Sequence, residues 1–362
     1  MSAAWIAEAH AFARWIGHIG DQAIALDTEF MRRDTFYPKL ALIQIAAGGE
    51  CALIDPVAFD AAPGMRVLAE NGTWIMHSAS EDMEALAPLL DGANLRLFDT
   101  QIAAALCGLG FGLSYRNLVS SLLGVEIPKD ETRSDWLRRP LTASQIDYAE
   151  QDIAHLHELH GLLTTQLRQR GRTAWHAEDC ARLTLRLRRV DADPQPQRAF
   201  RNAAAWPRAR QALLRRILRW REHTARALDK PRPWLLDDAN ALSLASSPPS
   251  SSNELFERTR GLRALRSAPR AELFELLRAP VTDSEIAETA PILGPPSGDA
   301  KAAVNTMKQT VDAIALKLEI PSGLLCPRRL LEEYAVTREW PEGLQGWRRE
   351  VLEPELAPLL DA

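Results

Sequence analysis

The chain has 362 residues, 46% of them hydrophobic and 25% charged, which is typical of a globular protein and excludes a disordered or collagen-like chain. Its 43 Lys and Arg residues and 48 Asp and Glu residues give a net charge of −5. The longest run without a charged residue, 100–115, covers only 16 residues and contains three glycines, so no membrane-spanning helix is expected. At roughly 100–200 residues per domain, we expect two or three domains.

The start of the chain and its cysteines speak against two further classes of protein. The first ten residues lack the basic start and the continuous apolar centre of a secretory signal, and Glu8 lies where that centre would be. We therefore expect a cytoplasmic protein. No two cysteines have the Cys-x-x-Cys spacing, so neither a zinc site nor a disulfide framework is predicted among Cys51, Cys107, Cys180 and Cys326.

The first block of the chain, to about residue 165, mixes strand-like and helix-like patterns. Helical patterns alternate with the later strands, which indicates a sheet covered by helices. Five short strands are expected, the first three of them joined antiparallel, at 23–30, 40–47, 51–55, 73–77 and 95–98.

Two helix starts can be placed in this block. The GLGFG run at 108–112 has the wrong spacing for a dinucleotide loop and predicts a turn, with Ser114 capping the helix that follows. Thr142 is expected to cap a long helix that continues to about Leu167.

The second half of the chain is almost entirely helical in pattern. It begins after VDADPQPQR at 190–198 and is interrupted at 246–252 by SSPPSSS, whose residues break helices. A third block follows PILGPPSG at 291–298, and apolar residues recur at helical spacing from Lys301 to Leu360. The carboxy-terminal half is therefore predicted to form two small helical modules.

The charge is distributed unevenly along the chain. Residues 166–235 contain 17 Arg and 1 Lys against 6 Asp and Glu, a net charge of +12, so the remainder carries −17. A basic middle is typical of contact with a polyanion, and equally of a solvated arginine-rich helix. The preference for Arg over Lys favours phosphate, because a guanidinium binds phosphate oxygens in pairs.

Two carboxylates are held together on the first predicted strand. Asp27 and Glu29 are two residues apart, and because side chains alternate across a strand, both project from the same face. Two like charges beside an apolar run are costly unless a divalent cation neutralises them, and carboxylate oxygens suit Mg²⁺ or Mn²⁺ better than zinc. If the pair stood alone, a solvent-exposed acidic pair at the edge of a strand would be the favoured interpretation.

Further polar residues follow in the same block. Asp82 is expected in the first turns of a helix that follows a strand, close to where the strand end opens. Tyr148 and Asp152 are four residues apart on the long helix and so share a face. His77, at the end of its strand, is interpreted as a supporting residue near the site.

These residues resemble the motifs of the DEDD exonuclease superfamily in its tyrosine subgroup: Asp-x-Glu in DTEF, a final Asp in HSASED, and Tyr-x-x-x-Asp in YAEQD. Longer segments resemble the ribonuclease D family within it, namely ALDTEFMRRDTFYPKLALIQIA, FDTQIAAAL and RSDWLRRPLTASQIDYAEQD. The helical half resembles two HRDC modules, through LLRRILRWREHTARALDKPRPWLLDD and LCPRRLLEEY with LQGWRREVL.

The resemblance implies an α/β ribonuclease H-like exonuclease domain, a mixed sheet flanked by helices, at 1–170. A basic linker at 171–205 and two all-α HRDC-like domains at 206–290 and 299–362 would follow. It also implies hydrolysis with two divalent ions, Mg²⁺ or Mn²⁺, which activate a water and stabilise the leaving 3′ oxygen.

By similarity, Asp27, Glu29 and Asp152 would hold one ion. Asp27 would bridge to a second ion, which Asp82 holds through water. Tyr148 would orient or deprotonate the attacking water, and the sequence leaves this choice open. Thr28, Phe30 and His77 are candidates for contact with the substrate.

The implied reaction removes 5′-mononucleotides from RNA 3′ ends, most of all from the 3′ trailers of precursor tRNA and other small structured RNAs. A monomer and no membrane partner are expected. A basic surface on the helical modules would bind phosphates without sequence preference. Its candidate residues are Arg208, Arg210, Arg215, Arg216, Arg219 and Arg221.

Two alternatives remain open at this point. A DNA 3′–5′ exonuclease of the same superfamily would share the motifs, because they do not read the 2′-hydroxyl. A nucleic-acid-binding scaffold without activity would share the fold, although it would have no reason to keep four carboxylates and Tyr148. The absence of GxxxxGK[ST] speaks against an ATP-driven helicase.

Overall fold

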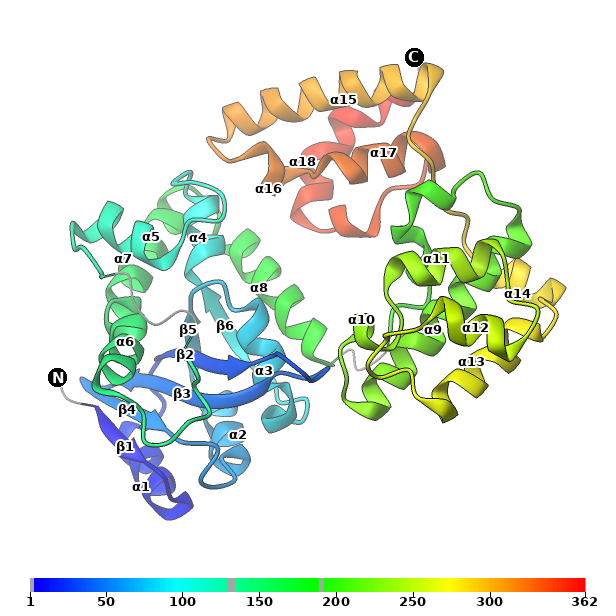
Figure 1. The fold of residues 1–362 in the computed structure, drawn as a ribbon. Coiled ribbons are helices and arrows are strands. Elements are labelled where there is room, and N and C mark those ends of the chain that lie inside the picture. The colour runs from blue at the N-terminus through cyan, green and yellow to red at the C-terminus, as the bar shows by residue number, and fades with distance from the viewer. Residues whose placement is uncertain (1–2, 129–133, 189–191, 362) are drawn as a thin grey trace. The chain divides into compact units, whose positions relative to one another are not determined.

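A six-stranded mixed sheet forms the centre of the amino-terminal part of the chain (Figure 1). The structure, a computed structural model, describes residues 3–128, 134–188 and 192–361. The strand order is β1-β4-β3-β2-β5-β6, with β2, β3 and β4 antiparallel and with β5 and β6 parallel to β2. The strands are β1 (Ala4–Ile6), β2 (Ile24–Met31), β3 (Lys39–Ala47), β4 (Glu50–Ile54), β5 (Thr73–Met76) and β6 (Arg96–Asp99).

The five predicted strands and their antiparallel start are confirmed to within a residue or two. The sequence pattern missed β1, because three residues are too few to show an alternation. β1 pairs with β4 in parallel and forms one edge of the sheet.

Helices cover both faces of this sheet. Leu26 belongs to the core beneath α1, α2 and α3, whereas its neighbour Ala25 belongs to the core beneath α4, α5 and α7. Strand alternation therefore decides which helices each side chain of β2 faces. The helices are α1 (Ala9–Ile19), α2 (Ala62–Asn71), α3 (Ser80–Leu90), α4 (Thr100–Leu106), α5 (Tyr115–Leu123), α6 (Ala143–Ala154), α7 (Leu156–Gln169) and α8 (Thr173–Arg188).

The single long helix expected from Thr142 to Leu167 is wrong: it is two helices that meet at His155. The hydroxyl of Tyr115 donates to the carbonyl of Gln151 at 3.1 Å and accepts from the backbone N–H of His155 at 3.0 Å. It thus replaces the i to i+4 bond that would continue α6, and a side chain inserted in this way interrupts a helix. The predicted caps are confirmed, since Ser114 caps α5 and Thr142 forms a capping box with Gln145.

The chain folds into two compact units. The first contains Met1–Met31, Pro38–Arg189 and Lys301–Ala362, so the carboxy-terminal helices belong with the sheet. The second contains Arg32–Tyr37 and Val190–Ala300. Residues 190 and 191, at the start of the predicted helical half, lie outside the described residues.

The carboxy-terminal helices are joined to α8 by polar and aromatic contacts. Asp179, on α8, accepts two bonds from the guanidinium of Arg348, at 2.5 and 2.9 Å, and both side chains are about nine-tenths buried. Trp347 stacks on Trp175 with ring centroids 4.4 Å apart. These helices are α15 (Gly298–Lys317), α16 (Ser322–Leu325), α17 (Arg328–Thr337), the 3-10 helix η3 (Glu342–Leu344), α18 (Trp347–Leu356) and α19 (Pro358–Asp361).

Gly346 is required at the start of α18. Its φ is +66°, and a Cβ added there would lie 1.8 Å from the Oε1 of Glu178, whose other oxygen accepts from the backbone N–H of Trp347 at 3.0 Å. Only glycine combines this backbone conformation with so close an approach.

The second unit is helical throughout its described residues and has its own core. Leu214, Ile217 and Trp220 of α9 lie at the centre of that core. The predicted SSPPSSS break lies between α11 and α12. The helices are η1 (Pro196–Ala199), η2 (Arg201–Ala203), α9 (Arg208–Leu228), α10 (Arg232–Leu235), α11 (Asp238–Ser246), α12 (Ser252–Arg258), α13 (Ser267–Arg278) and α14 (Asp283–Glu288).

The connection between β2 and β3 belongs to this second unit. Asp229, which ends α9 with a φ of +48°, accepts from the backbone N–H groups of Phe36 and Tyr37 at 2.9 and 3.1 Å. The guanidinium groups of Arg226 and Arg232 lie 5.3 and 4.7 Å from the ring of Phe36. The loop that follows β2, the strand that carries Asp27 and Glu29, is therefore held by the turn between α9 and α10.

All four cysteines are free, and no helix in the described part of the chain has both the length and the apolar character needed to cross a bilayer.

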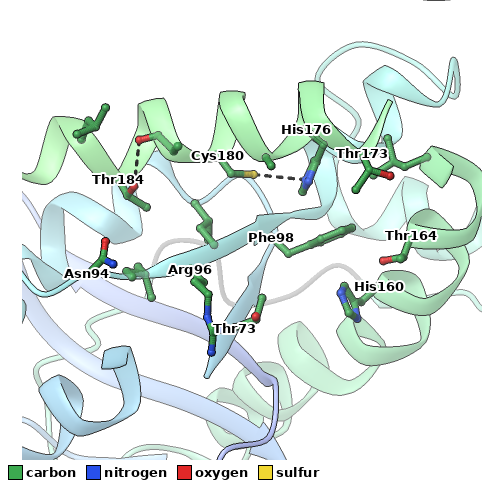
Figure 2. Close-up of a pocket in the computed structure, with 16 residues that line it drawn as sticks. Thr73, Asn94, Arg96, Phe98, His160, Thr164, Thr173, His176, Cys180 and Thr184 are labelled. Carbon is green, nitrogen blue, oxygen red and sulfur yellow. Dashed lines mark hydrogen bonds between the residues drawn. The ribbon is translucent and has the colours of Figure 1, made fainter. Parts of the chain in front are cut away.

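A cavity of about 560 Å³ lies between β6, α7 and α8 (Figure 2). The ring of Phe98 lies between His160 and His176, and the Sγ of Cys180 is 3.4 Å from the Nε2 of His176. That Nε2 also lies 3.1 Å from the carbonyl of Asp99, which can only accept, so it carries the proton. Because burial raises the pKa of the Cys180 thiol and lowers that of His176, this pair stays neutral and is not an activated nucleophile.

The tie between Asp179 and Arg348 yields a stability prediction. Arg348→Ala leaves a buried carboxylate without its cation and is expected to destabilise the first unit by about 3–5 kcal/mol. Chemical denaturation followed by tryptophan fluorescence measures this, because Trp175 and Trp347 adjoin the pair. The double variant Asp179→Asn with Arg348→Met leaves no buried charge and is expected to lose much less stability. An equal loss of stability in the two variants would show that the unpaired charge of Asp179 is not the cause.

Candidate functional site

The carboxylates of β2 follow directly after the point where its pairing with β5 ends. β5 pairs with β2 at Ile24 and Ala25, and Asp27 and Glu29 come next along the strand. The pairing of β2 with β3 shifts register between Glu29 and Phe30, which marks a β-bulge. Bulges bend a strand and redirect its side chains, and here the bulge lies beside the carboxylates.

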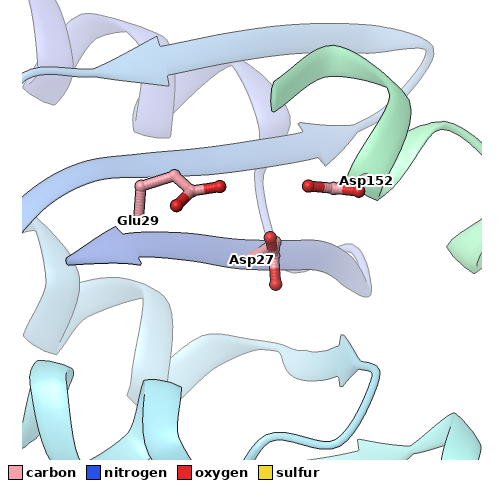
Figure 3. A group of neighbouring side chains, drawn as sticks. All are labelled: Asp27, Glu29 and Asp152. Atoms are coloured by element: carbon pink, nitrogen blue, oxygen red, sulfur yellow. The ribbon is translucent and has the colours of Figure 1, made fainter. Parts of the chain in front are cut away.

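Asp152 reaches the same point from α6. One carboxylate oxygen from each of Asp27, Glu29 and Asp152 lies within 4.8 Å of the others. Figure 3 shows the two strand carboxylates and the helix carboxylate converging on one small volume. Among the described residues, this is the group of three or more Asp, Glu, His or Cys side chains spaced to hold a metal ion.

Asp82 stands beside this group rather than within it. It lies in the first turn of α3, is 9% exposed, and accepts a 2.6 Å hydrogen bond from the hydroxyl of Thr28. Thr28 lies between Asp27 and Glu29, so alternation turns it toward α3. The Asp82 charge is nevertheless the strongest of those that raise the pKa of Asp27. The structure therefore brings all four predicted carboxylates into one neighbourhood.

Burial raises the pKa of every carboxyl in this group, and repulsion from other members raises it further for Asp27, Glu29 and Asp152. For Asp27 burial is the largest cause, followed by the charges of Asp82, Asp152 and Glu29, and its pKa lies well above the usual value. Burial also raises the pKa of Glu29 to about 9, of Asp152 to about 7 and of Asp82 to about 6. Without a cation, the site retains protons at neutral pH.

Tyr148 lies one turn from Asp152 on α6 and hydrogen-bonds to its carboxylate. Burial, followed by the charges of Asp152, Glu29 and Asp27, raises the pKa of Tyr148 above the usual value of 10. The phenol therefore stays protonated and donates a hydrogen bond to the carboxylate of Asp152.

Two of the three predicted substrate contacts are engaged with the protein instead. The hydroxyl of Thr28 is bound to Asp82, and Thr28 is 6% exposed. The Nδ1 of His77 lies 2.9 Å from the hydroxyl of Thr100, and its Nε2 lies 2.9 Å from the carbonyl of Leu113. Burial lowers the pKa of His77, so the ring is neutral and its polar atoms are occupied. Phe30 is partly exposed.

Three residues near the site had no motif to mark them. Asp99 accepts from the backbone N–H of Ser78 and Ala79, ahead of α3, and also caps α4. Tyr115 interrupts the helix that carries Asp152. The Arg116 cation lowers the pKa of Asp152. A local sequence signal existed only for Asp99, which stands immediately before a helical run and so reads as an N-cap.

The predicted phosphate-binding arginines of α9 are mostly committed to internal contacts. Arg216 binds Glu285, and Arg221 binds Asp238 at 2.7 Å. Arg215 is 9% exposed and donates to the carbonyl of Pro194. Arg208 and Arg210 also donate to protein acceptors, Thr289 and Ala245 among them. Among the six predicted residues, Arg219 is exposed and has no partner within the described part of the chain.

The residues of the site fit a divalent cation. The donors that converge are carboxylate oxygens, the ligands that Mg²⁺ and Mn²⁺ prefer, and the group contains no thiolate or imidazole. Their pKa values are raised even though the Arg116 cation lowers that of Asp152, so the positive charge nearby is too small to balance the carboxylates. A divalent ion supplies the missing charge and removes the cost of holding the carboxylates together.

Comparison with known proteins agrees with this geometry. The sequence profile of a 3′–5′ exonuclease family matches residues 3–168, which include all four carboxylates and Tyr148. Ribonuclease D of Xanthomonas oryzae is 40% identical over 94% of this chain and 93% of its own length, and ribonuclease D of Escherichia coli is 31% identical over 93% and 92%.

The crystal structure of Escherichia coli RNase D, described as an exoribonuclease involved in structured RNA processing, is similar over 100% of this chain and 99% of its own, with a TM-score of 0.82 and 28% identity. The α/β exonuclease fold and the mostly helical carboxy-terminal part predicted from the sequence are thereby confirmed. Full-length similarity of this kind favours RNA over DNA as the substrate class. The chain belongs to the ribonuclease D family of 3′–5′ exoribonucleases.

Proposed function

We propose that this protein uses two divalent ions, Mg²⁺ or Mn²⁺, to remove 5′-mononucleotides one at a time from the 3′ ends of structured RNAs. The 3′ trailers of precursor tRNA are the proposed main substrate, and a cytoplasmic monomer is the proposed form. The observation that carries the proposal is the convergence of Asp27, Glu29 and Asp152 within 4.8 Å, with Asp82 beside them.

The carboxylates divide between the two ions in a way that their positions support. Asp27, Glu29 and Asp152 would hold the first ion, because their oxygens converge. Asp27 and Asp82 would hold the second, because Asp82 lies near Asp27 and outside the group of three. When bound, the ions would lower the pKa of the attacking water and stabilise the negative charge that develops on the leaving 3′ oxygen.

The chain's own groups prepare this site. Thr28 holds Asp82 in place through a hydrogen bond to one of its carboxylate oxygens. Tyr148, protonated and bound to Asp152, orients the attacking water through its phenolic oxygen rather than deprotonating it. Phe30, next to Glu29 at the bulge, would stack on the terminal base. Arg116 would approach the scissile phosphate from the side of Asp152.

His77 and Asp99 are proposed as positioning residues rather than substrate contacts. His77 links β5 to Thr100 and to the loop before α5. Asp99 holds the backbone that leads into α3, the helix that carries Asp82.

The first test removes the carboxylate of Asp27, which would be a ligand of both ions. Asp27→Asn is expected to lower kcat by about 1,000-fold or more, because one ligand of both ions is lost. The measurement is stepwise shortening of a 5′-labelled tRNA with a short 3′ trailer, with Mg²⁺, with Mn²⁺ and with EDTA, beside single-stranded DNA of equal length. Asp147→Asn makes the same chemical change on an exposed position of α6 and is expected to retain activity.

Three outcomes of this assay would overturn parts of the proposal. Shortening in EDTA at the wild-type rate would exclude the metal mechanism. Faster shortening of DNA than of RNA would overturn the assignment of RNA as substrate. If the wild type binds both nucleic acids and shortens neither, the protein would be a binding scaffold.

The raised pKa values predict how stability depends on pH in the metal-free protein. Folding raises the pKa of these carboxyls, so the stability they contribute is full near pH 4 and is lost as pH rises through about 6 to 9. In EDTA, the free energy of unfolding is expected to fall by about 2–4 kcal/mol between pH 5 and pH 9. Saturating Mn²⁺ is expected to remove this fall.

Denaturant unfolding at each pH measures this, and Glu29→Gln provides the matched control. The difference between wild type and Glu29→Gln isolates the site from His77 and His176, whose lowered pKa values act in the opposite direction below pH 6.5. A wild-type profile in EDTA that coincides with that of Glu29→Gln would contradict the account.

A further inference from the structure

The second unit carries an arginine-rich surface outside α9. The segment 256–270, from the end of α12 to the start of α13, contains five Arg and one Glu, a net charge of +4 in 15 residues. We call this segment, together with Trp234 of α10, the arginine-aromatic surface. The helices that carry it are labelled in Figure 1.

Aromatic rings hold three of these guanidinium groups. Arg263 lies over Trp234 at 5.1 Å, and Arg260 and Arg270 lie over Phe256 at 5.8 and 4.9 Å. A guanidinium stacked on a ring keeps the N–H groups of its edge free to bind phosphate oxygens in pairs. Phe256 is itself 41% exposed, so part of its ring is open to solvent.

The backbone beneath these side chains is fixed. The backbone N–H of Ala264 donates to the carbonyl of Trp234 at 2.8 Å, and the buried hydroxyl of Thr259 donates to the carbonyl of Leu255 at 2.7 Å. Leu265 is 1% exposed and anchors the turn in the core. The surface is therefore positioned before any ligand arrives, which lowers the entropy cost of binding.

Among the described residues, two arginines of the segment differ from most of those of α9 in having no carboxylate or carbonyl partner, whereas Arg258 binds Glu254 and Arg260 binds Glu257 at 2.7 Å. Arg216 and Arg221 of α9 are bound to carboxylates. Arg263 and Arg266 are exposed, and within the described ranges neither guanidinium has a carboxylate or carbonyl partner. In a chain with more acidic than basic residues, positive charge left without a partner on a fixed turn is suited to a polyanion.

We propose that the arginine-aromatic surface binds the sugar-phosphate backbone of the RNA substrate upstream of its terminal 3′ nucleotide. The inference rests on the proposed function for the presence of RNA, and it replaces α9 with Arg263, Arg266 and Arg270 as the phosphate-binding residues. Guanidinium groups interleaved with aromatic rings fit phosphates flanked by bases better than they fit an acidic protein surface. The surface supplies affinity without sequence preference.

The test compares two substrates and two charge-matched variants. Arg263→Glu with Arg266→Glu reverses both unpartnered charges, and Arg14→Glu with Arg329→Glu makes the same change on exposed arginines of α1 and α17. The substrates are a tRNA with a 3′ trailer and a five-nucleotide RNA that fills only the catalytic site. Rates are measured with Mg²⁺ over a range of KCl concentrations.

The surface variant is expected to raise KM for the tRNA by about tenfold or more and to leave kcat unchanged. The slope of log KM against log salt is expected to fall by about 1.4–1.8, since each lost phosphate contact contributes about 0.7–0.9. Kinetics on the five-nucleotide RNA, and all kinetics of the Arg14/Arg329 variant, are expected to match the wild type.

Each other outcome overturns a specific claim. If the surface variant retains the wild-type KM and salt slope on the tRNA, the surface does not bind RNA. If the Arg14/Arg329 variant shows the same loss, net charge rather than this surface governs affinity. If the wild type shortens neither RNA, the proposed function fails whatever the variants show. If the surface variant shortens the tRNA as the wild type does but binds polyglutamate more weakly than the wild type, the surface binds an acidic protein instead.

Discussion

Mutual repulsion among buried carboxylates is the constraint on which this site depends. Asp27, Glu29, Asp82 and Asp152 come from a strand and two helices, and the scaffold holds them close enough for each to raise the pKa of another. A fold does not retain such an arrangement for stability, because replacing the charges with apolar groups would remove the cost. The cost has a function only if a cation occupies the site.

The scaffold opposes this repulsion with local contacts. β2 is held on one edge along its length by β3, and the bulge at Glu29 directs its carboxylate toward α6. Asp82 is held by Thr28, and α6 stops where Tyr115 takes the place of its next hydrogen bond, three residues after Asp152. Beyond the interruption, α7 packs on the core through Leu159, Leu163 and Leu167.

Much of this was predictable from the sequence, because the signals are local. The alternation of β2 places Asp27 and Glu29 on one face, the i to i+4 spacing pairs Tyr148 with Asp152, and Thr142 marks the start of α6 through its capping box. The residues that escaped prediction act across long separations. Tyr115 reaches Gln151 from 36 positions away, and β1 is defined by its pairing with β4 rather than by its own three residues.

The arginines show the same limit of prediction from sequence, because their partners lie far away along the chain. A count of charges locates positive residues along the chain, but it cannot tell which of them are bound internally. Arg216 reaches Glu285 across 69 positions, and this contact turns a predicted phosphate ligand into a link between α9 and α14. Arg263 and Arg266 lie outside the most basic stretch of the sequence, and only the structure shows that they have no such partner within its described part.

The number of protons that leave the site when a cation binds tests most directly whether the carboxylates hold protons in its absence. Titration calorimetry with Mn²⁺ at pH 7, in buffers of different ionisation enthalpy, gives this number. The pKa of Asp27 lies well above its usual value, that of Glu29 is about 9 and that of Asp152 is about 7, so release of more than one proton per protein is expected, and fewer from Glu29→Gln. A binding enthalpy that does not depend on the buffer would show that the carboxylates are already ionised before the cation binds.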